Sequence, residues 1–190
     1  MFLRTFTALA LATLSATAAA QKIDINLSQD SARFTYISLI GGSTFGRTEM
    51  NIGVLYNEDK NSALDIGLHV IDVAGSKTPG LQVGVGPRLY YVTSDKPEAS
   101  GASVALGGKL SYKFPSLQRL SLGASFYYAP SITSILDSEN MSEFGLRVAY
   151  EILPTASAYI GHRNLGMSFD GDIGHETIDS TTYVGMDIAF

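Results

Sequence analysis

Apolar residues recur at every second position along most of the chain after residue 48, and polar residues or glycines lie between them. Alternation with period two is typical of a β-strand whose two faces meet different surroundings. No helical spacing at i, i+3 and i+4 competes in these windows. The clearest alternating segments are residues 50–56, 64–70, 81–89, 104–110, 120–126 and 144–152.

Four further segments bring the predicted number of strands to ten, although eight remain possible if the N-terminal pair is not what it seems. They are residues 23–27, 33–40, 155–163 and about 177–190. Most of the ten are near the 9–11 residues that a tilted membrane strand needs. The facing of the second strand is ambiguous, because Phe34 and Tyr36 share one parity while Ile37 and Leu39 share the other.

The C-terminal segment alternates up to its last residue, with Met186, Ile188 and Phe190 on one parity and Gly185 and Asp187 on the other. A closed barrel requires its first and last strands to pair, since an open sheet edge is not tolerated in lipid. The ending resembles the C-terminal signal read by the bacterial barrel-assembly machinery, although a polar residue is usual where residue 184 is valine. We therefore expect this machinery as a partner during biogenesis.

The N-terminal segment has the three parts of a secretory signal peptide. Arg4 supplies a basic region, residues 6–14 are apolar but too short to span a bilayer, and residues 18–20 are three alanines that fit a cleavage site. A transmembrane anchor is disfavoured, because threonine and serine dilute the segment and no second basic flank follows. We predict a signal peptide at 1–20 and a single barrel domain at 21–190, which begins at Gln21 or Lys22.

Composition narrows the class of protein further. Without residues 1–20 the chain keeps 12 of its 13 basic residues against 18 acidic ones, a net charge of −6, and no basic stripe suggests nucleic acid. The chain has no cysteine, so no disulfide framework supports the fold. The mean hydropathy is nevertheless +0.14. Strands with one lipid-facing side reconcile these facts.

The connections predict how the strands cross the membrane. Short joins at residues 75–80, 114–119 and 153–155 are expected to be periplasmic turns, and longer polar loops at 93–101, 129–142 and 164–176 are expected to be extracellular. A periplasmic β-sandwich would also alternate. It is disfavoured because glycine recurs on the polar parity, aromatic residues cluster at strand ends and charges lie only on the polar parity.

The fold class expected is therefore an antiparallel transmembrane β-barrel of about ten strands with a narrow lumen filled by side chains. Lipid-facing positions near the bilayer midplane should include Leu68, Leu106, Leu122 and Leu146, and a side chain added at Gly67 or Gly123 should crowd the interior. Charges on the polar parity should pair across neighbouring strands, for example Asp65 with Arg88 and Arg163 with Asp187. These charges are Asp65, Arg88, Lys109, Glu143, Arg147, Glu151, Arg163 and Asp187.

Two neighbouring stretches, residues 104–115 and 122–132, look like the central block of the YfaZ family of proteobacterial outer-membrane proteins. The Tyr-Tyr-Ala-Pro-Ser run at 127–131 is their most specific piece, and further similarity lies at 26–30, 161–163 and 183–186. The resemblance implies an outer-membrane barrel. It carries over no activity and no functional residues.

Several motifs suggest chemistry but lack the residues that the chemistry needs. Gly84-Val85-Gly86 lacks the third glycine and the helix of a dinucleotide loop, and Gly108-Lys109 is followed by leucine where a phosphate loop needs serine or threonine. Residues 170–176 resemble a calcium loop without the third acidic ligand and the bidentate glutamate. A solvated acidic loop is the favoured interpretation, and loose divalent bridging to lipopolysaccharide is an intermediate one.

A surface hydrolase would need a nucleophile, a base and an orienting group. His162, Ser168 and Asp170 permit such a triad on paper, while His69 lies in the middle of a strand and His175 in the last large loop. No serine-centred motif supports the idea, so we assign no catalytic, cofactor-binding or metal residues and no cofactor.

The function predicted is an integral outer-membrane barrel of unassigned activity, with a structural or surface-interaction role. A narrow channel for small solutes or ions is the alternative, and a surface hydrolase is less favoured. The expected partners are outer-membrane lipids and lipopolysaccharide, with no nucleic acid, and the expected state is a monomer.

Overall fold

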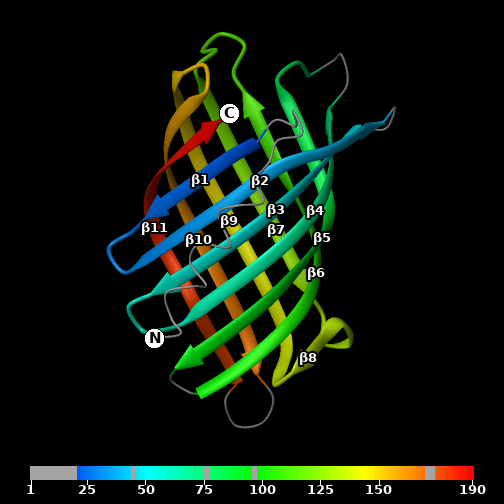
Figure 1. Ribbon diagram of the computed structural model, residues 1–190, viewed down its shortest axis with the longest axis vertical. Helices are drawn as coiled ribbons and strands as arrows, with labels where there is room; N and C mark the ends of the chain where they lie inside the picture. Colours follow the sequence, from blue (N-terminus) through cyan, green and yellow to red (C-terminus); the bar gives the residue numbers. More distant parts are fainter. Residues whose placement is uncertain (1–20, 44–45, 75–77, 96–97, 170–173) are drawn as a thin grey trace, which may run out of the picture.

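The computed structural model describes residues 21–43, 46–74, 78–95, 98–169 and 174–190. Ten strands close into an antiparallel barrel in which each strand pairs with its neighbours in the chain and β1 pairs with β11 (Figure 1). The prediction of ten strands is thus confirmed, and eight is excluded. The barrel strands are β1 (Gln21–Leu27), β2 (Ser31–Ser43), β3 (Gly46–Asn57), β4 (Ser62–Val73), β5 (Leu81–Asp95), β6 (Glu98–Lys113), β7 (Leu120–Ala129), β9 (Ser138–Leu153), β10 (Ala156–Phe169) and β11 (Gly174–Ala189).

A short extra strand, β8 (Ser134–Leu136), follows a single 3₁₀ turn at Ser131–Thr133. It pairs with the start of β6, beyond the point where the β6–β7 pairing stops. The sequence pattern had placed this whole stretch in a loop. Within the described part of the chain, no helix is long and apolar enough to cross a membrane.

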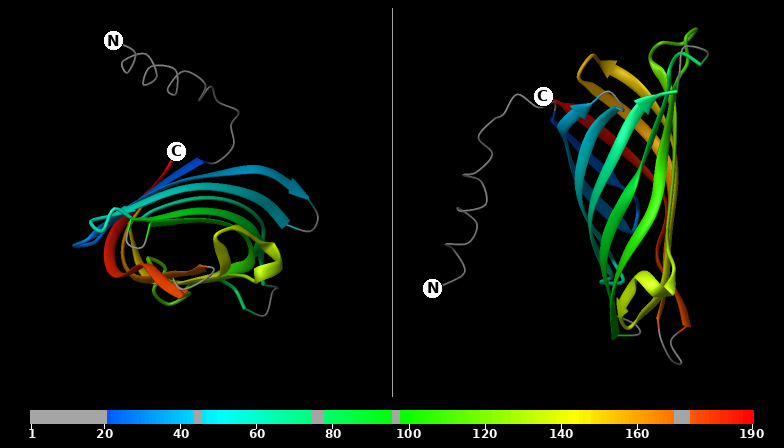
Figure 2. Two further views of the ribbon diagram at one scale, coloured as in Figure 1. Left: turned by 90° about the horizontal axis from the view of Figure 1, so that it is seen from below. Right: turned by 90° about the vertical axis from the view of Figure 1, so that its right-hand side faces the viewer.

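The two ends of the barrel carry different parts of the chain. The terminal end is where β1 begins and β11 finishes, and the loop end is the opposite one, where β10 turns into β11 (Figure 1). Figure 2 shows the ring of strands from the loop end and from the side, with a flattened cross-section. All chain connections therefore alternate between these two ends.

The loops predicted at the loop end are shorter than expected, because the strands continue into them. β5 runs to Asp95 and β6 already starts at Glu98, while β10 runs to Phe169. The inward side of these extensions carries buried apolar side chains such as Ala99 and Met167. Their packing explains why residues with a polar, loop-like composition remain in strand.

The outer face of the barrel is apolar, as the alternation predicted. The four leucines expected to face lipid are all exposed, between 43% and 70%. Exposed aromatic residues also lie on the outer surface near the strand ends, as an interfacial girdle requires. The leucines are Leu68, Leu106, Leu122 and Leu146, and the aromatic residues include Tyr56, Tyr91, Tyr128, Tyr150 and Phe190.

The ambiguous facing of β2 has a structural cause. Arg33 and Thr35 are buried inside, and Phe34 points outward with 46% of its surface exposed. Ile37 lies on the same inner parity as Arg33 and Thr35 and lines the lumen cavity, so apolar residues occur on both faces of this strand. The β2–β3 register shift between Leu39 and Gly41 comes only after this segment.

Inward-facing glycines lie directly opposite large side chains on the neighbouring strand. A Cβ atom at Gly67 would lie 2.4 Å from Asn51 Oδ1, and one at Gly123 would lie 2.9 Å from Arg147 Cγ. This geometry supports the expectation that a side chain added at either glycine crowds the interior. The cross-strand pairs are Gly53–Asp65, Gly67–Arg88, Gly84–Lys109, Gly107–Tyr127, Gly123–Arg147, Gly161–Tyr183 and Gly185–Tyr159.

Candidate functional site in the barrel lumen

Four buried charges from β2, β4, β5 and β9 meet inside the barrel and form what we call the central network: Arg33, Asp65, Arg88 and Glu143. Arg33 contacts Asp65 at 2.5 Å and Glu143 at 2.6 Å. Arg88 contacts the same two carboxylates at 2.6 Å and 3.3 Å. Each arginine thus bridges both acids, and the two positive and two negative charges cancel. The predicted pairing of Asp65 with Arg88 is confirmed.

Neutral side chains complete the central network. The Tyr90 hydroxyl donates a hydrogen bond to Glu143, and the Asn51 amide donates to Asp65 at 3.0 Å. The Arg88 guanidinium lies over the rings of Tyr90 and Tyr127, 5.3 Å and 5.0 Å from their centroids. Burial of a charge is tolerated when opposite charges and hydrogen bonds surround it, and these contacts meet that condition.

The loop-end half of the lumen is filled by packed apolar side chains, which we call the loop-end core. Each strand from β3 to β11 except the short β8 contributes to it. Tyr90 and Tyr127 belong to both the core and the surroundings of the central network, so the two are continuous. The core residues are Leu55, Ala63, Tyr90, Val92, Ala99, Ala105, Tyr127, Ala129, Met141, Leu165, Met167, Phe169 and Ile178.

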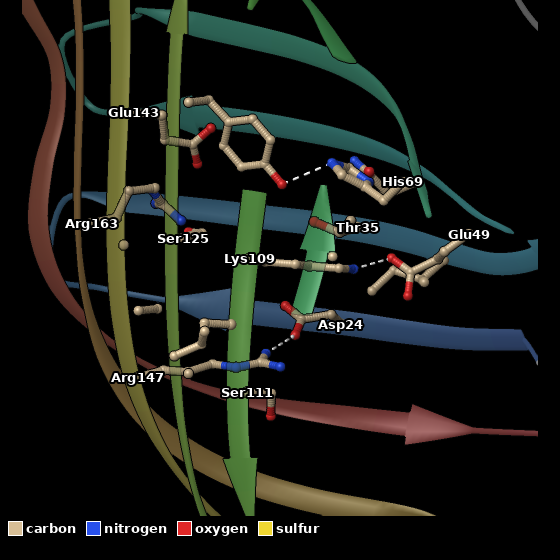
Figure 3. Close-up of a pocket in the computed structure, with 18 of the residues that line it drawn as sticks. Asp24, Thr35, Glu49, His69, Lys109, Ser111, Ser125, Glu143, Arg147 and Arg163 are labelled. Atoms are coloured by element: carbon tan, nitrogen blue, oxygen red, sulfur yellow. Dashed lines mark hydrogen bonds and ion pairs between the residues drawn. The ribbon is translucent and has the colours of Figure 1, made fainter. Parts of the chain in front are cut away.

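The terminal-end half of the lumen contains a cavity of about 340 Å³, which we call the terminal-end cavity. Two ion pairs line it and are shown in Figure 3, and in a third pair only the lysine lines it. His69 also lines it, and its Nε2 atom lies 2.8 Å from the Tyr127 hydroxyl. The ion pairs are Lys22–Asp187 at 2.9 Å, Arg147–Asp24 at 3.3 Å, and Lys109–Glu49.

The predicted pairing of Arg163 with Asp187 is wrong. Arg163 instead donates to Asp179 at 2.7 Å and to Asn26 at 2.9 Å. In the β10–β11 register Arg163 lies opposite Thr181, six residues from Asp187 and therefore about 20 Å away along the strand. Asp179 is within diagonal reach of Arg163, whereas Asp187 is within reach of Lys22 on β1. The alternation of residues correctly predicted that Arg163 and Asp187 face the lumen. The strand register determines which residue each of them pairs with.

The residues of the hypothetical hydrolase do not come together. His162 is exposed on the outer face, whereas Ser168 is buried and lies six residues further along β10. The Ser168 hydroxyl instead lies 3.1 Å from Asn140 Oδ1 and 3.3 Å from His175 Nδ1. Asp170 lies outside the described residues, as does most of the loop that resembles a calcium site.

The described residues contain no group of three or more histidines and carboxylates arranged to hold a metal ion. They also give the Ser168–His175 contact no carboxylate that would orient the imidazole. The described lumen offers charged and hydrogen-bonding groups to a small solute.

Sequence reasoning missed several charges of the lumen. Arg33 was hidden by the mixed parity of β2, and Glu49 lies just before the segment where regular alternation was recognised. Asp24 alternates with Ile23 and Ile25, which was a usable signal in a strand judged short. A count of charges on the inner parity of every strand would have found Asp24 and Glu49, but their partners require the register.

Comparisons with known proteins identify one matching family model and several similar solved structures. Residues 3–190 match the family model described as "YfaZ precursor". Similar solved structures include the KdgM porin, with 13% identity, a TM-score of 0.45 and coverage of 90% of this chain and 99% of that one. They also include the outer membrane protease OmpT from Escherichia coli, with 10% identity, a TM-score of 0.46 and coverage of 90% and 93%. No curated protein matches the chain significantly.

Proposed function

The chain belongs to the YfaZ family, and we propose that it is an integral outer-membrane barrel whose lumen is closed to solute flow. Its role is then structural or one of surface interaction, and we assign it no catalytic activity. The observation that carries this proposal is the continuity of the central network with the loop-end core. Together they occupy the lumen between the terminal-end cavity and the loop end.

The outer surface supports membrane insertion. Leucine, valine or isoleucine side chains are exposed on all ten barrel strands. A monomeric soluble protein rarely exposes a contiguous apolar surface of this kind. A lipid-facing band flanked by aromatic residues is what a transmembrane barrel requires.

We propose that the terminal end faces the periplasm and the loop end faces the outside. The partners are then outer-membrane lipids and lipopolysaccharide around a monomeric barrel, and the assembly machinery during biogenesis. Phe190 is 63% exposed, and its backbone pairs with Gln21. Deleting Phe190 should leave export intact but reduce insertion, measured by heat-modifiable gel mobility and protease resistance.

Conductance across planar bilayers tests the closed lumen. Refolded wild-type protein should give no stable porin-like steps, because buried side chains would have to leave the lumen before ions could pass. Liposome swelling with small sugars should likewise stay at the level of protein-free vesicles. Large and steady wild-type conductance would refute the closed lumen.

The terminal-end cavity favours one second function, a narrow channel for small solutes or ions. A polar cavity covers part of the route that a channel needs. The remaining part is closed by Arg33, Glu143 and the loop-end core. Small, reproducible conductance steps in the wild type would therefore favour the channel.

A further inference from the structure

We propose that the terminal-end cavity is a binding site for a small anion that carries a phosphate or carboxylate group. The proposal goes beyond the closed barrel described above and rests on it only for the side from which the ligand arrives. Six of the cavity-lining residues are basic and three are acidic, while three further carboxylates, Asp65, Asp179 and Asp187, pair with lining basic residues without lining the cavity themselves. The basic residues are Lys22, Arg33, Arg88, Lys109, Arg147 and Arg163, and the acidic ones are Asp24, Glu49 and Glu143.

The three ion pairs at the cavity are asymmetric in exposure. The side chains of Lys22, Lys109 and Arg147 are 29%, 33% and 36% exposed. Their carboxylate partners are only 10–11% exposed. In each pair the cation is thus about three times as exposed as its carboxylate, although Asp24 and Glu49 also line the cavity. A solute that enters meets positive charge first.

Buried polar atoms without partners lie on the same wall. His69 Nδ1 and Arg33 Nε have no hydrogen-bond partner among the described residues. Both side chains are more than nine-tenths buried and line the cavity. When Tyr127 donates to His69 Nε2, His69 Nδ1 carries a hydrogen. Both unpartnered atoms are then donors, and an accepting ligand that reached them after a shift of the neighbouring side chains would satisfy them.

Two glycines hold the cations close to the wall. Lys109 lies over Gly84, whose Cβ would be 3.1 Å from Lys109 Cγ, and Arg147 lies over Gly123, whose Cβ would be 2.9 Å from Arg147 Cγ. Each glycine leaves room for the stem of the opposite side chain, so the charged ends can reach Glu49 on β3 and Asp24 on β1. Figure 3 shows Lys109 and Arg147 extending across the wall toward their acidic partners.

The size and the neutral lining restrict the ligand further. A volume of about 340 Å³ is at the lower end of the range for small-molecule sites. Hydroxyl and amide groups suited to polar ligand atoms also line the cavity. They belong to Thr35, Asn51, Gln82, Ser111 and Ser125.

Isothermal titration calorimetry of refolded protein in detergent micelles tests the proposal. Glucose 6-phosphate is the anionic probe, glucose is the neutral control and glucosamine is the cationic control. Glucose 6-phosphate should bind at least about tenfold more tightly than either control, because charge-assisted hydrogen bonds distinguish them. Its affinity should fall as salt concentration rises.

Two matched substitutions on β6 locate the site. Lys109→Gln should weaken glucose 6-phosphate binding about tenfold. Lys113→Gln makes the same change on the same strand, but Lys113 does not line the cavity and pairs with Glu151 at 2.7 Å. That control should bind like the wild type. Loss of binding in both variants would overturn the assignment to the cavity.

A third variant is expected to strengthen glucose 6-phosphate binding instead of weakening it. Glu49→Gln removes the acidic partner of Lys109 and should tighten glucose 6-phosphate binding, whereas a structural defect would weaken it. If Lys109→Gln unfolds, the Glu49→Gln result decides alone. Equal binding of all three probes, or no binding of any, would refute the anion site. The measurement needs no bilayer, so its failure would leave the closed barrel untouched.

Discussion

The two halves of the lumen differ although the same strands build both. The loop-end half buries tyrosine, methionine and phenylalanine side chains almost completely, with Tyr90, Met141 and Phe169 at most 1% exposed. The terminal-end half keeps a cavity lined by charges, three of whose cations remain about one-third exposed. Outside, both halves carry the same apolar alternation.

This contrast shows that the lipid constrains one face of each strand and leaves the other face free. On the outer face, the residues that meet the hydrocarbon region are constrained to be apolar, because a charged side chain there is destabilising. The inner face can be either a dry core or a wet site. The central network separates the two, since its charges are satisfied by one another and by Tyr90 and Asn51.

The largest loss of stability should come from disrupting the central network, which lies between the two halves of the lumen. Glu143→Ala would leave Arg33 and Arg88 with one carboxylate between them inside the lumen. Removing one partner of a buried ion pair costs about 3–5 kcal/mol of unfolding free energy. Urea unfolding of the refolded protein in micelles measures it.

The control for this change lies on the same strand. Glu139→Ala removes an exposed carboxylate from β9, and its cost should stay within about 0.5 kcal/mol. Equal urea midpoints for the two variants would show that the central network does not hold the halves together.

A second prediction concerns the outer face, where the same substitution should cost a similar unfolding free energy in either half of the barrel. Leu106→Arg and Leu122→Arg each place a charge against lipid, which should cost about 2–4 kcal/mol near the bilayer midplane. Leu106 pairs with Tyr128, and Leu122 pairs with Tyr112 nearer the terminal end. Urea titration in lipid vesicles measures both. Near-neutral midpoints for both variants would mean that the assigned facing is wrong.

A smaller difference in unfolding free energy is expected when glycine is replaced by alanine in each half of the lumen. A Cβ at Gly101 in the loop-end half would lie 2.6 Å from Met167 Sδ and Ser138 Cβ, so Gly101→Ala should cost about 1–3 kcal/mol. A Cβ at Gly84 would lie 3.1 Å from Lys109 Cγ and 3.2 Å from Ile71 Cγ1, and a shift of a few tenths of an ångström in these side chains relieves both contacts. The net change for Gly84→Ala should be within about 0.5 kcal/mol. Equal destabilisation by the two variants would remove the distinction between a packed half and an open one.

The fold could be predicted from the sequence because lipid imposes a repeating rule on the outer face. Leu64, Ile66, Leu68 and their counterparts show that rule without any knowledge of partners. The interior follows no such rule. Arg163 was correctly placed inside, but its partner Asp179 depends on a β10–β11 register that includes a bulge.

The loop-end core could not be predicted for a related reason. Leu165, Met167 and Phe169 alternate with glycine and serine in a segment whose composition is typical of a loop. Only the pairing of β10 with β9 and β11 shows that these side chains share an interior with Met141 and Ile178. The cavity was missed for the same reason, since a volume depends on which glycines lie opposite which side chains.

Thiol labelling in cells tests the unequal lumen most directly, because the chain contains no cysteine. Ser111→Cys places a thiol in the terminal-end cavity, Ala105→Cys places one on the same strand in the loop-end core, and Ile132→Cys is a loop-end control that is 90% exposed. With a membrane-impermeant maleimide, only Ile132→Cys should react in intact cells. Permeabilising the outer membrane should add Ser111→Cys and leave Ala105→Cys protected. Reaction of Ser111→Cys in intact cells as fast as Ile132→Cys would contradict a lumen closed at the loop end.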